Sequence, residues 1–137
     1  MKKTLKILLY LFTIYHALLG IIGVLFVGFE DLVRKAAALA FNFNLNMDAQ
    51  TIWMLKPFAA YMFVMGVVGF FAAKHPGKYK PVVYSIAVLI LIRAIQRIIF
   101  AFQGDQFLLN ADPTRNVIVL VFLSVYGLAI LYLAKRT

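Results

Sequence analysis

The residues most able to do chemistry in this chain are two arginines and a glutamine inside an apolar stretch. The stretch PVVYSIAVLILIRAIQRIIFAFQGD, residues 81–105, carries Arg93, Gln96 and Arg97 at spacings that place them on one helix face. A guanidinium suits planar, bidentate recognition of carboxylate or phosphate groups. Arg93 lies twelve residues after Pro81, so about 18 Å along a helix at 1.5 Å per residue. A charge so deep in an apolar helix indicates a functional site.

The composition predicts that these residues belong to an integral membrane protein. The 137 residues are 64% hydrophobic and 14% charged, whereas soluble domains are about half apolar and about a quarter charged. The net charge of +9 comes without a long basic tail or a basic–aromatic groove. We therefore expect contacts with the lipid bilayer and its anionic head groups, and no nucleic-acid partner. The absence of cysteine excludes disulfides, thiolate metal sites and thiol nucleophiles.

Four long apolar segments predict an all-α fold, with one domain of four transmembrane helices in an antiparallel bundle over residues 1–137. The expected spans are residues 7–29, 52–73, 82–103 and 117–134. Between the first two spans, Glu30 and Asp31 followed by LVRKAAALA predict a short interfacial helix. The next residues, FNFNLNMD, alternate apolar and polar side chains, which predicts an extended segment.

The distribution of charge predicts the orientation of this bundle. The N-terminus, the turn at residues 74–80 and the C-terminus together hold eight Lys or Arg residues and no acid. All five acids lie in the two loops on the opposite side. By the positive-inside rule both termini are cytoplasmic, and we expect a bacterial inner membrane.

Further polar side chains share the approximate depth of Arg93. His16 lies nine residues into the first span, and Tyr15, Tyr61 and Gln96 fall in the same broad layer. Helix rise predicts the depth of these residues, but not the direction in which they face. His16 is either a hydrogen-bonded packing residue or an axial ligand to a haem or chlorophyll shared with a partner. A metal site within one chain is not expected.

Small residues recur on three of the predicted spans, where they would let two helix backbones approach closely. They are Ala17, Gly20, Gly23, Gly66, Gly69, Ser124 and Gly127.

Three interpretations of the arginine face stay open. In the first, Arg93 donates to carbonyl and hydroxyl oxygens, while Arg97 meets Asp105, Glu30 or a lipid phosphate. In the second, the face meets another subunit or its cofactor. In the third, it forms a pocket for an anionic or carbonyl-bearing molecule such as a quinone or lipid. The sequence lacks HExxH, a Gly-rich phosphate loop, G-x-S-x-G and paired carboxylates within a span, which favours a role without catalysis.

The segment LIRAIQRIIFAFQGDQ is similar to the arginine-bearing third span of the DoxX-like group of small four-helix membrane proteins. The layout of spans and loops resembles that group over most of the chain. Two positions depart from its pattern: Ile92 stands where the group often has glycine, and Asn116 stands near where its last span often has an acid. The resemblance implies a membrane protein linked to redox or quinone chemistry.

Two functions follow as hypotheses. The first is a non-enzymatic accessory subunit of a larger membrane complex of the electron-transfer or photosynthetic kind, in contact with other membrane subunits. The alternative is a DoxX-like membrane protein that binds a quinone, lipid or other small molecule through the Arg/His/Gln layer.

Overall fold

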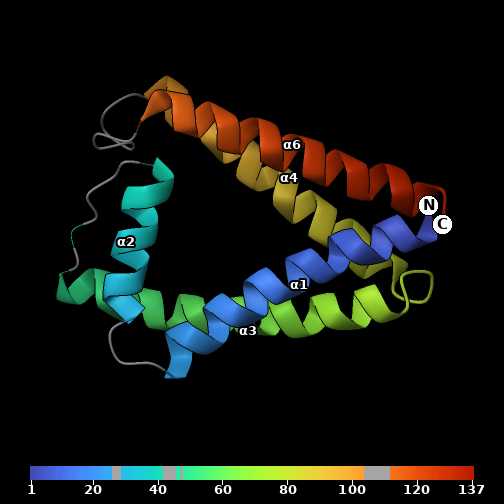
Figure 1. Ribbon diagram of the computed structural model, residues 1–137, viewed down its shortest axis with the longest axis horizontal. Helices are drawn as coiled ribbons and strands as arrows, with labels where there is room; N and C mark the ends of the chain where they lie inside the picture. Colours follow the sequence, from blue (N-terminus) through green and yellow to red (C-terminus); the bar gives the residue numbers. More distant parts are fainter. Residues whose placement is uncertain (26–28, 42–45, 47, 104–111) are drawn as a thin grey trace.

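The computed structural model describes residues 1–25, 29–41, 46, 48–103 and 112–137, and these residues form five helices (Figure 1). The helices are α1 (Lys2–Leu25), α2 (Phe29–Phe41), α3 (Ala49–Lys74), α4 (Lys80–Gln103) and α6 (Pro113–Lys135). The described residues contain no strand, so the all-α class is confirmed. Four of these helices, α1, α3, α4 and α6, are long and apolar enough to cross a membrane.

The helices begin earlier than the apolar spans, because polar residues can extend a helix beyond its apolar part. Phe29, expected at the end of the first span, instead begins α2. Glu30 and Asp31 in the first turn of α2 favour that start, since acids stabilise the N-terminus of a helix. The extended segment expected after α2 falls mainly outside the described residues; Phe41, its expected first residue, ends α2.

Aspartates cap two of the long helices. The Asp48 carboxylate accepts a hydrogen bond of 2.7 Å from the backbone N–H of Thr51 at the start of α3. This bond favours the ionised form and lowers the pKa of Asp48 below its ordinary value. Asp112 accepts a 2.8 Å bond from the N–H of Thr114 at the start of α6. The two caps fix where α3 and α6 begin.

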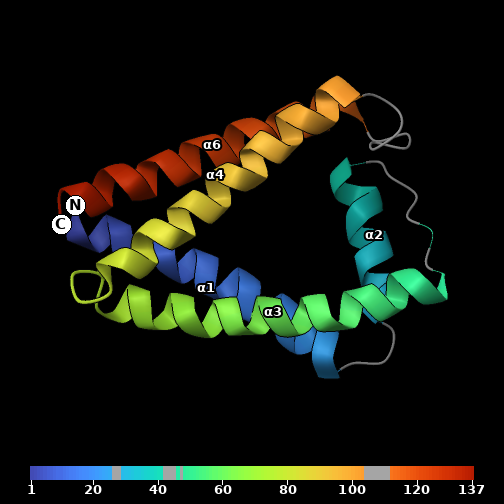
Figure 2. The same ribbon diagram turned by 180° about the vertical axis from the view of Figure 1, so that it is seen from behind.

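The four long helices form two pairs that meet at one end and diverge at the other (Figures 1 and 2). α1 lies along α3, and α4 lies along α6, with the two helices of each pair running in opposite directions. Both termini and the turn between α3 and α4 lie where the pairs meet, which we call the narrow end. α2 lies at the opposite, wide end. The long helices therefore form a V.

Glycines bring the helices of each pair into close contact. A Cβ atom at Gly20 of α1 would lie 2.3 Å from the backbone nitrogen of Phe63 in α3. A Cβ atom at Gly66 would lie 2.7 Å from the backbone nitrogen of Ala17, so the two helix backbones touch. Gly69 and Gly127 instead pack against side chains: a Cβ atom would lie 2.7 Å from Oγ1 of Thr13 at Gly69, and 2.8 Å from the Leu91 side chain at Gly127. Gly23 is buried and Ser124 is partly buried.

The apolar core lies at the narrow end, where all four long helices converge. Its largest fully buried side chains are Leu5, Leu9, Val83, Ile86 and Ile130. Beyond this core the hydroxyl of Tyr126 in α6 donates a 2.6 Å hydrogen bond to the carbonyl of Leu8 in α1. The core and this bond hold the two pairs together at the narrow end.

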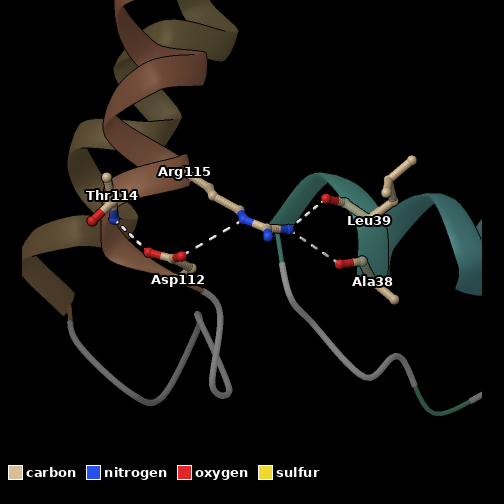
Figure 3. Close-up of polar contacts among 5 residues, drawn as sticks. All are labelled: Ala38, Leu39, Asp112, Thr114 and Arg115. Carbon is tan, nitrogen blue, oxygen red and sulfur yellow. Dashed lines mark hydrogen bonds and ion pairs between the residues drawn. The ribbon is translucent and has the colours of Figure 1, made fainter.

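The short helix α2 bridges the wide end. At its start, Glu30 lies 3.7 Å from the ammonium of Lys56 in α3. At its end, the guanidinium of Arg115 in α6 donates to the carbonyls of Ala38 and Leu39 (Figure 3). α2 is thus tied to one helix of each pair.

Candidate functional site

A pocket of about 630 Å³ lies between α1, α4 and α6, next to the apolar core on the side of the wide end. It brings together five of the six residues predicted to bind a ligand or partner: Tyr15, His16, Arg93, Gln96 and Arg97. Its lining residues are Leu11, Phe12, Tyr15, His16, Ile90, Arg93, Gln96, Arg97, Val119, Phe122, Leu123 and Tyr126. The volume is within the roughly 300–1,000 Å³ that is usual for small-molecule sites.

His16 is held by its own helix in an orientation that leaves one ring nitrogen available. Its Nδ1 lies 2.8 Å from the carbonyl oxygen of Phe12, one turn earlier on α1. Because a carbonyl only accepts, Nδ1 carries the hydrogen, and Nε2 of the neutral ring is an acceptor. The structure gives Nε2 no hydrogen-bond partner among the described residues. The imidazole packs on the Phe12 ring, with 3.9 Å between the ring centres.

Arg93 contributes an uncompensated positive charge to the pocket. Its side chain is partly buried and forms no hydrogen bond or ion pair with any residue in the described part of the chain. It lies within electrostatic range of His16 and Arg97, both of which are basic. The N–H donors of Arg93 were expected to bind carbonyl and hydroxyl oxygens of the protein. They are therefore available to another molecule.

Arg97 has different surroundings from Arg93, because Asn116 of α6 faces it. The Arg97 guanidinium donates to the Asn116 side-chain oxygen at 3.5 Å, and the Asn116 amide donates to the Arg97 carbonyl at 3.3 Å. Asn116 is 2% exposed. Glu30, which was expected near Arg97, pairs with Lys56 instead, and Asp105 lies outside the described residues.

Tyr61 is not brought to the pocket. It lies on α3, where its side chain is 70% exposed, and it is not among the residues that line the cavity. Its neighbours Ala59 and Met62 are buried instead, so the packed face of α3 directs Tyr61 outward. Tyr15 and Gln96 do line the pocket, and both are exposed at its edge.

Sequence reasoning did not find the contribution of α6. Phe122 and Tyr126 stack at 5.7 Å between ring centres, and with Val119 and Leu123 they form an apolar wall opposite Arg93. Asn116 offered a signal, as an amide that precedes the uninterrupted apolar run VIVLVFL. The aromatic residues of this apolar helix gave no such signal, because the direction in which their side chains point depends on tertiary packing.

The chemistry of the pocket is that of recognition. Two guanidinium groups, an amide, two tyrosine hydroxyls and an imidazole acceptor line the pocket beside apolar side chains, and no described lining residue is Asp or Glu. Within the described ranges, no three His, Asp or Glu side chains gather as metal ligands. The arrangement fits a molecule with an oxygen-rich head and an apolar body.

No family model, curated protein or solved structure matches this chain. The resemblance to DoxX-like proteins stays a prediction.

Proposed function

We propose that this chain is an integral membrane protein whose four long helices cross the bilayer, with both termini in the cytoplasm. These helices expose many large apolar side chains along their outward faces, far beyond what soluble monomers expose. The narrow end gathers the basic N-terminus, C-terminus and α3–α4 turn, whereas Glu30, Asp31, Asp48 and Asp112 lie at the wide end. The positive-inside rule then places the narrow end on the cytoplasmic side, in a bacterial inner membrane.

The orientation can be measured on single-cysteine variants, because the chain has no cysteine of its own. We expect Lys78→Cys at the narrow end to react with a membrane-impermeant maleimide only after the membrane is opened. Asn46→Cys, between α2 and α3, should react in intact cells. The reverse pattern would overturn the proposed orientation.

Within the membrane, we propose that the protein binds a lipid-soluble small molecule through the pocket between α1, α4 and α6. The observation that carries this proposal is Arg93, a charged side chain that faces a cavity and bonds to no described residue. An arginine at the centre of a spanning helix costs roughly 2.5–3.5 kcal/mol on insertion scales. A ligand oxygen that accepts from the guanidinium would offset part of this cost.

The polar groups define which ligands fit. Arg93 and Gln96 can donate to a carbonyl or an anionic oxygen, and His16 Nε2 can accept from a hydroxyl. A quinone or a lipid satisfies these donors. Nε2 is also the atom that would serve as axial ligand to a haem or chlorophyll shared with a partner.

Membership of a larger membrane complex stays a prediction. Tyr15, Leu11 and Phe122 are exposed at the edge of the pocket, so a partner's group could reach Arg93 from the side. Purification at native expression levels in a mild detergent distinguishes an accessory subunit from a protein that binds a small molecule on its own. A chain that runs alone as a monomer would exclude the accessory subunit and leave the binding protein.

Filling the pocket is the direct test of binding. Val119→Trp places an indole in the cavity, whereas Val121→Trp adds the same side chain on the exposed face of the same helix. We expect wild type and Val121→Trp to retain a short-chain ubiquinone analogue or hexadecanoic acid in native mass spectrometry, and Val119→Trp to lose it. Equal retention by both variants, or no retention by wild type, would contradict the proposal.

A further inference from the structure

The described residues that line the pocket concentrate positive charge. Arg93 and Arg97 both line it, and none of the described lining residues is acidic. Asn116 supplies Arg97 with a neutral acceptor, and Arg93 has no acceptor among the described residues. In a low-dielectric site two like charges repel strongly, so a bound anion is favoured over a neutral molecule. Charge balance thus distinguishes an acid from an uncharged quinone.

His16 adds a second requirement for the head group. Its Nδ1 is occupied by the Phe12 carbonyl, which leaves Nε2 as an acceptor beside two guanidinium donors. A head group that accepts a hydrogen bond from Arg93 and donates one from an O–H to Nε2 of His16 satisfies both residues. A phosphate monoester carries this combination together with a negative charge, because its monoanion keeps one O–H beside its charged oxygens. A carboxyl group either keeps its O–H and is neutral, or is ionised and accepts from Arg93. An alcohol can donate and accept but brings no charge, and a quinone has no O–H to donate.

The apolar part of the pocket opens sideways between α1 and α6. Leu11 of α1 and Phe122 of α6 both line the cavity, yet they are 55% and 64% exposed on the outer surface. On the side of the narrow end, the Tyr126–Leu8 hydrogen bond closes the same gap between these helices. A ligand can therefore place its head beside Arg93 while its chain extends between Leu11 and Phe122 into the bilayer.

We propose that the ligand is an amphiphile with an acid head group, carboxyl or phosphate, held between Arg93 and His16, which enters the pocket from the bilayer between α1 and α6. This inference rests on the proposed binding function and names the class of its ligand. The acid head supplies the negative charge that the lining residues lack, and the aromatic and aliphatic wall receives the beginning of the chain.

Four probes with matched properties test the head group on the full chain in nonionic micelles. They are hexadecanoic acid, hexadecyl phosphate, hexadecanol and a short-chain ubiquinone analogue. We expect at least one of the two acids to bind about tenfold or more tightly than hexadecanol and the quinone, as charge-assisted hydrogen bonds do over neutral contacts. The tighter of the two acids identifies the head group as carboxyl or phosphate.

Substitution of Arg93 tests the anchor. Arg93→Gln should reduce binding of the acid to the level of hexadecanol, and Arg93→Lys should retain an intermediate affinity, because it keeps the charge without the bidentate fork. Arg136→Gln at the C-terminus is the matched control and should bind as wild type does. Because Arg93 has no described partner, its loss leaves no group among the described residues unpaired, and unchanged unfolding curves would verify the fold.

The outcomes separate this inference from the function on which it rests. Acid binding that is unchanged in Arg93→Gln, or equally tight binding of hexadecanol and the quinone, would overturn the acid head group. If that non-selective binding is still lost in Val119→Trp and kept in Val121→Trp, the pocket remains a binding site of another specificity. No binding of any probe would remove both proposals.

Discussion

Arg93 and Arg97 lie one helical turn apart on α4, yet only Arg97 has a reciprocal contact with α6 in the described part of the chain. Asn116 accepts from its guanidinium and donates to its carbonyl. This pair links α4 to α6 at the edge of the pocket, while Arg93 faces the cavity itself. We therefore expect separate roles for the two arginines: Arg97 in helix packing, and Arg93 in the proposed ligand recognition.

Asn116→Leu should lower the free energy of unfolding, because it removes both hydrogen bonds to Arg97. Interhelical hydrogen bonds in membrane proteins contribute about 0.6 kcal/mol on average and up to about 1.7 kcal/mol, so we expect a loss in that range. Asn116→Asp keeps an acceptor for Arg97, so it should lower the free energy of unfolding by less. Denaturant titration in micelles measures both. An Asn116→Leu protein as stable as wild type would contradict the structural role of the pair.

Asp48 makes the start of α3 sensitive to acid. Its hydrogen bond from the Thr51 N–H holds the pKa of the folded state below the ordinary value of 3.8. The cap therefore stabilises α3 above that value, and its contribution is lost as the pH falls through the lowered pKa. Asp48→Ser keeps a cap without a charge. The difference in melting temperature between wild type and Asp48→Ser should shrink or reverse between about pH 6 and about pH 3. A difference independent of pH would contradict the role of the Asp48 carboxylate.

Helix α1 and helix α3 pack as a unit because glycines let their backbones touch. Gly20→Ala would place a Cβ 2.3 Å from the Phe63 nitrogen, so the helices must separate. Overpacking of this kind costs about 1–3 kcal/mol. Gly77→Ala is the matched control, because a Cβ there meets no atom within 4 Å. The free energy of unfolding measured in micelles should fall for Gly20→Ala and change little for Gly77→Ala. Equal stability of the two variants would exclude a close contact between α1 and α3.

Helix α2 depends on Arg115 for its attachment to α6. Arg115→Gln shortens the side chain that donates to the Ala38 and Leu39 carbonyls (Figure 3). We expect the amides in the last turns of α2 to exchange with solvent about threefold to tenfold faster, as the loss of a partly exposed charged hydrogen bond implies. Arg34→Gln, whose ion pair with Asp31 lies within α2, should have a smaller effect there. If the amides of α2 exchange no faster in either variant than in wild type, α2 is held by other contacts.

Across the whole molecule, the basic narrow end and the bridging helix α2 lie at opposite ends of the V (Figure 2). The pocket is lined by residues of α1, α4 and α6. The narrow end holds the apolar core, so the pairs are fixed there and the pocket lies where they begin to diverge. In the proposed function, a ligand would approach this position from the lipid phase while its head reaches Arg93.

The depth of the polar residues was predictable from the sequence, because helix rise is nearly constant. Tyr15, His16, Arg93 and Gln96, predicted to share a layer, do line one pocket, together with Arg97 one turn further along α4. Tyr61 has a similar depth but faces away, since facing depends on how α3 packs against α1. The role of Asn116, the aromatic wall from α6 and the divergence of the helix pairs depend on contacts far apart in sequence. The lengths of the apolar segments and the distribution of charge do not predict these contacts.

The most direct test of the central claim is photolabelling by a hexadecanoic acid with a diazirine near its carboxyl group, in the full chain within bilayers. The labelled residues are identified by mass spectrometry. We expect labels on the pocket residues of α1 and α6, at Leu11, Val119 and Phe122, and a marked decrease of these labels in Arg93→Gln. Labels spread over exposed faces of the helices, such as Phe70 and Phe71 of α3, and unchanged by Arg93→Gln would contradict it.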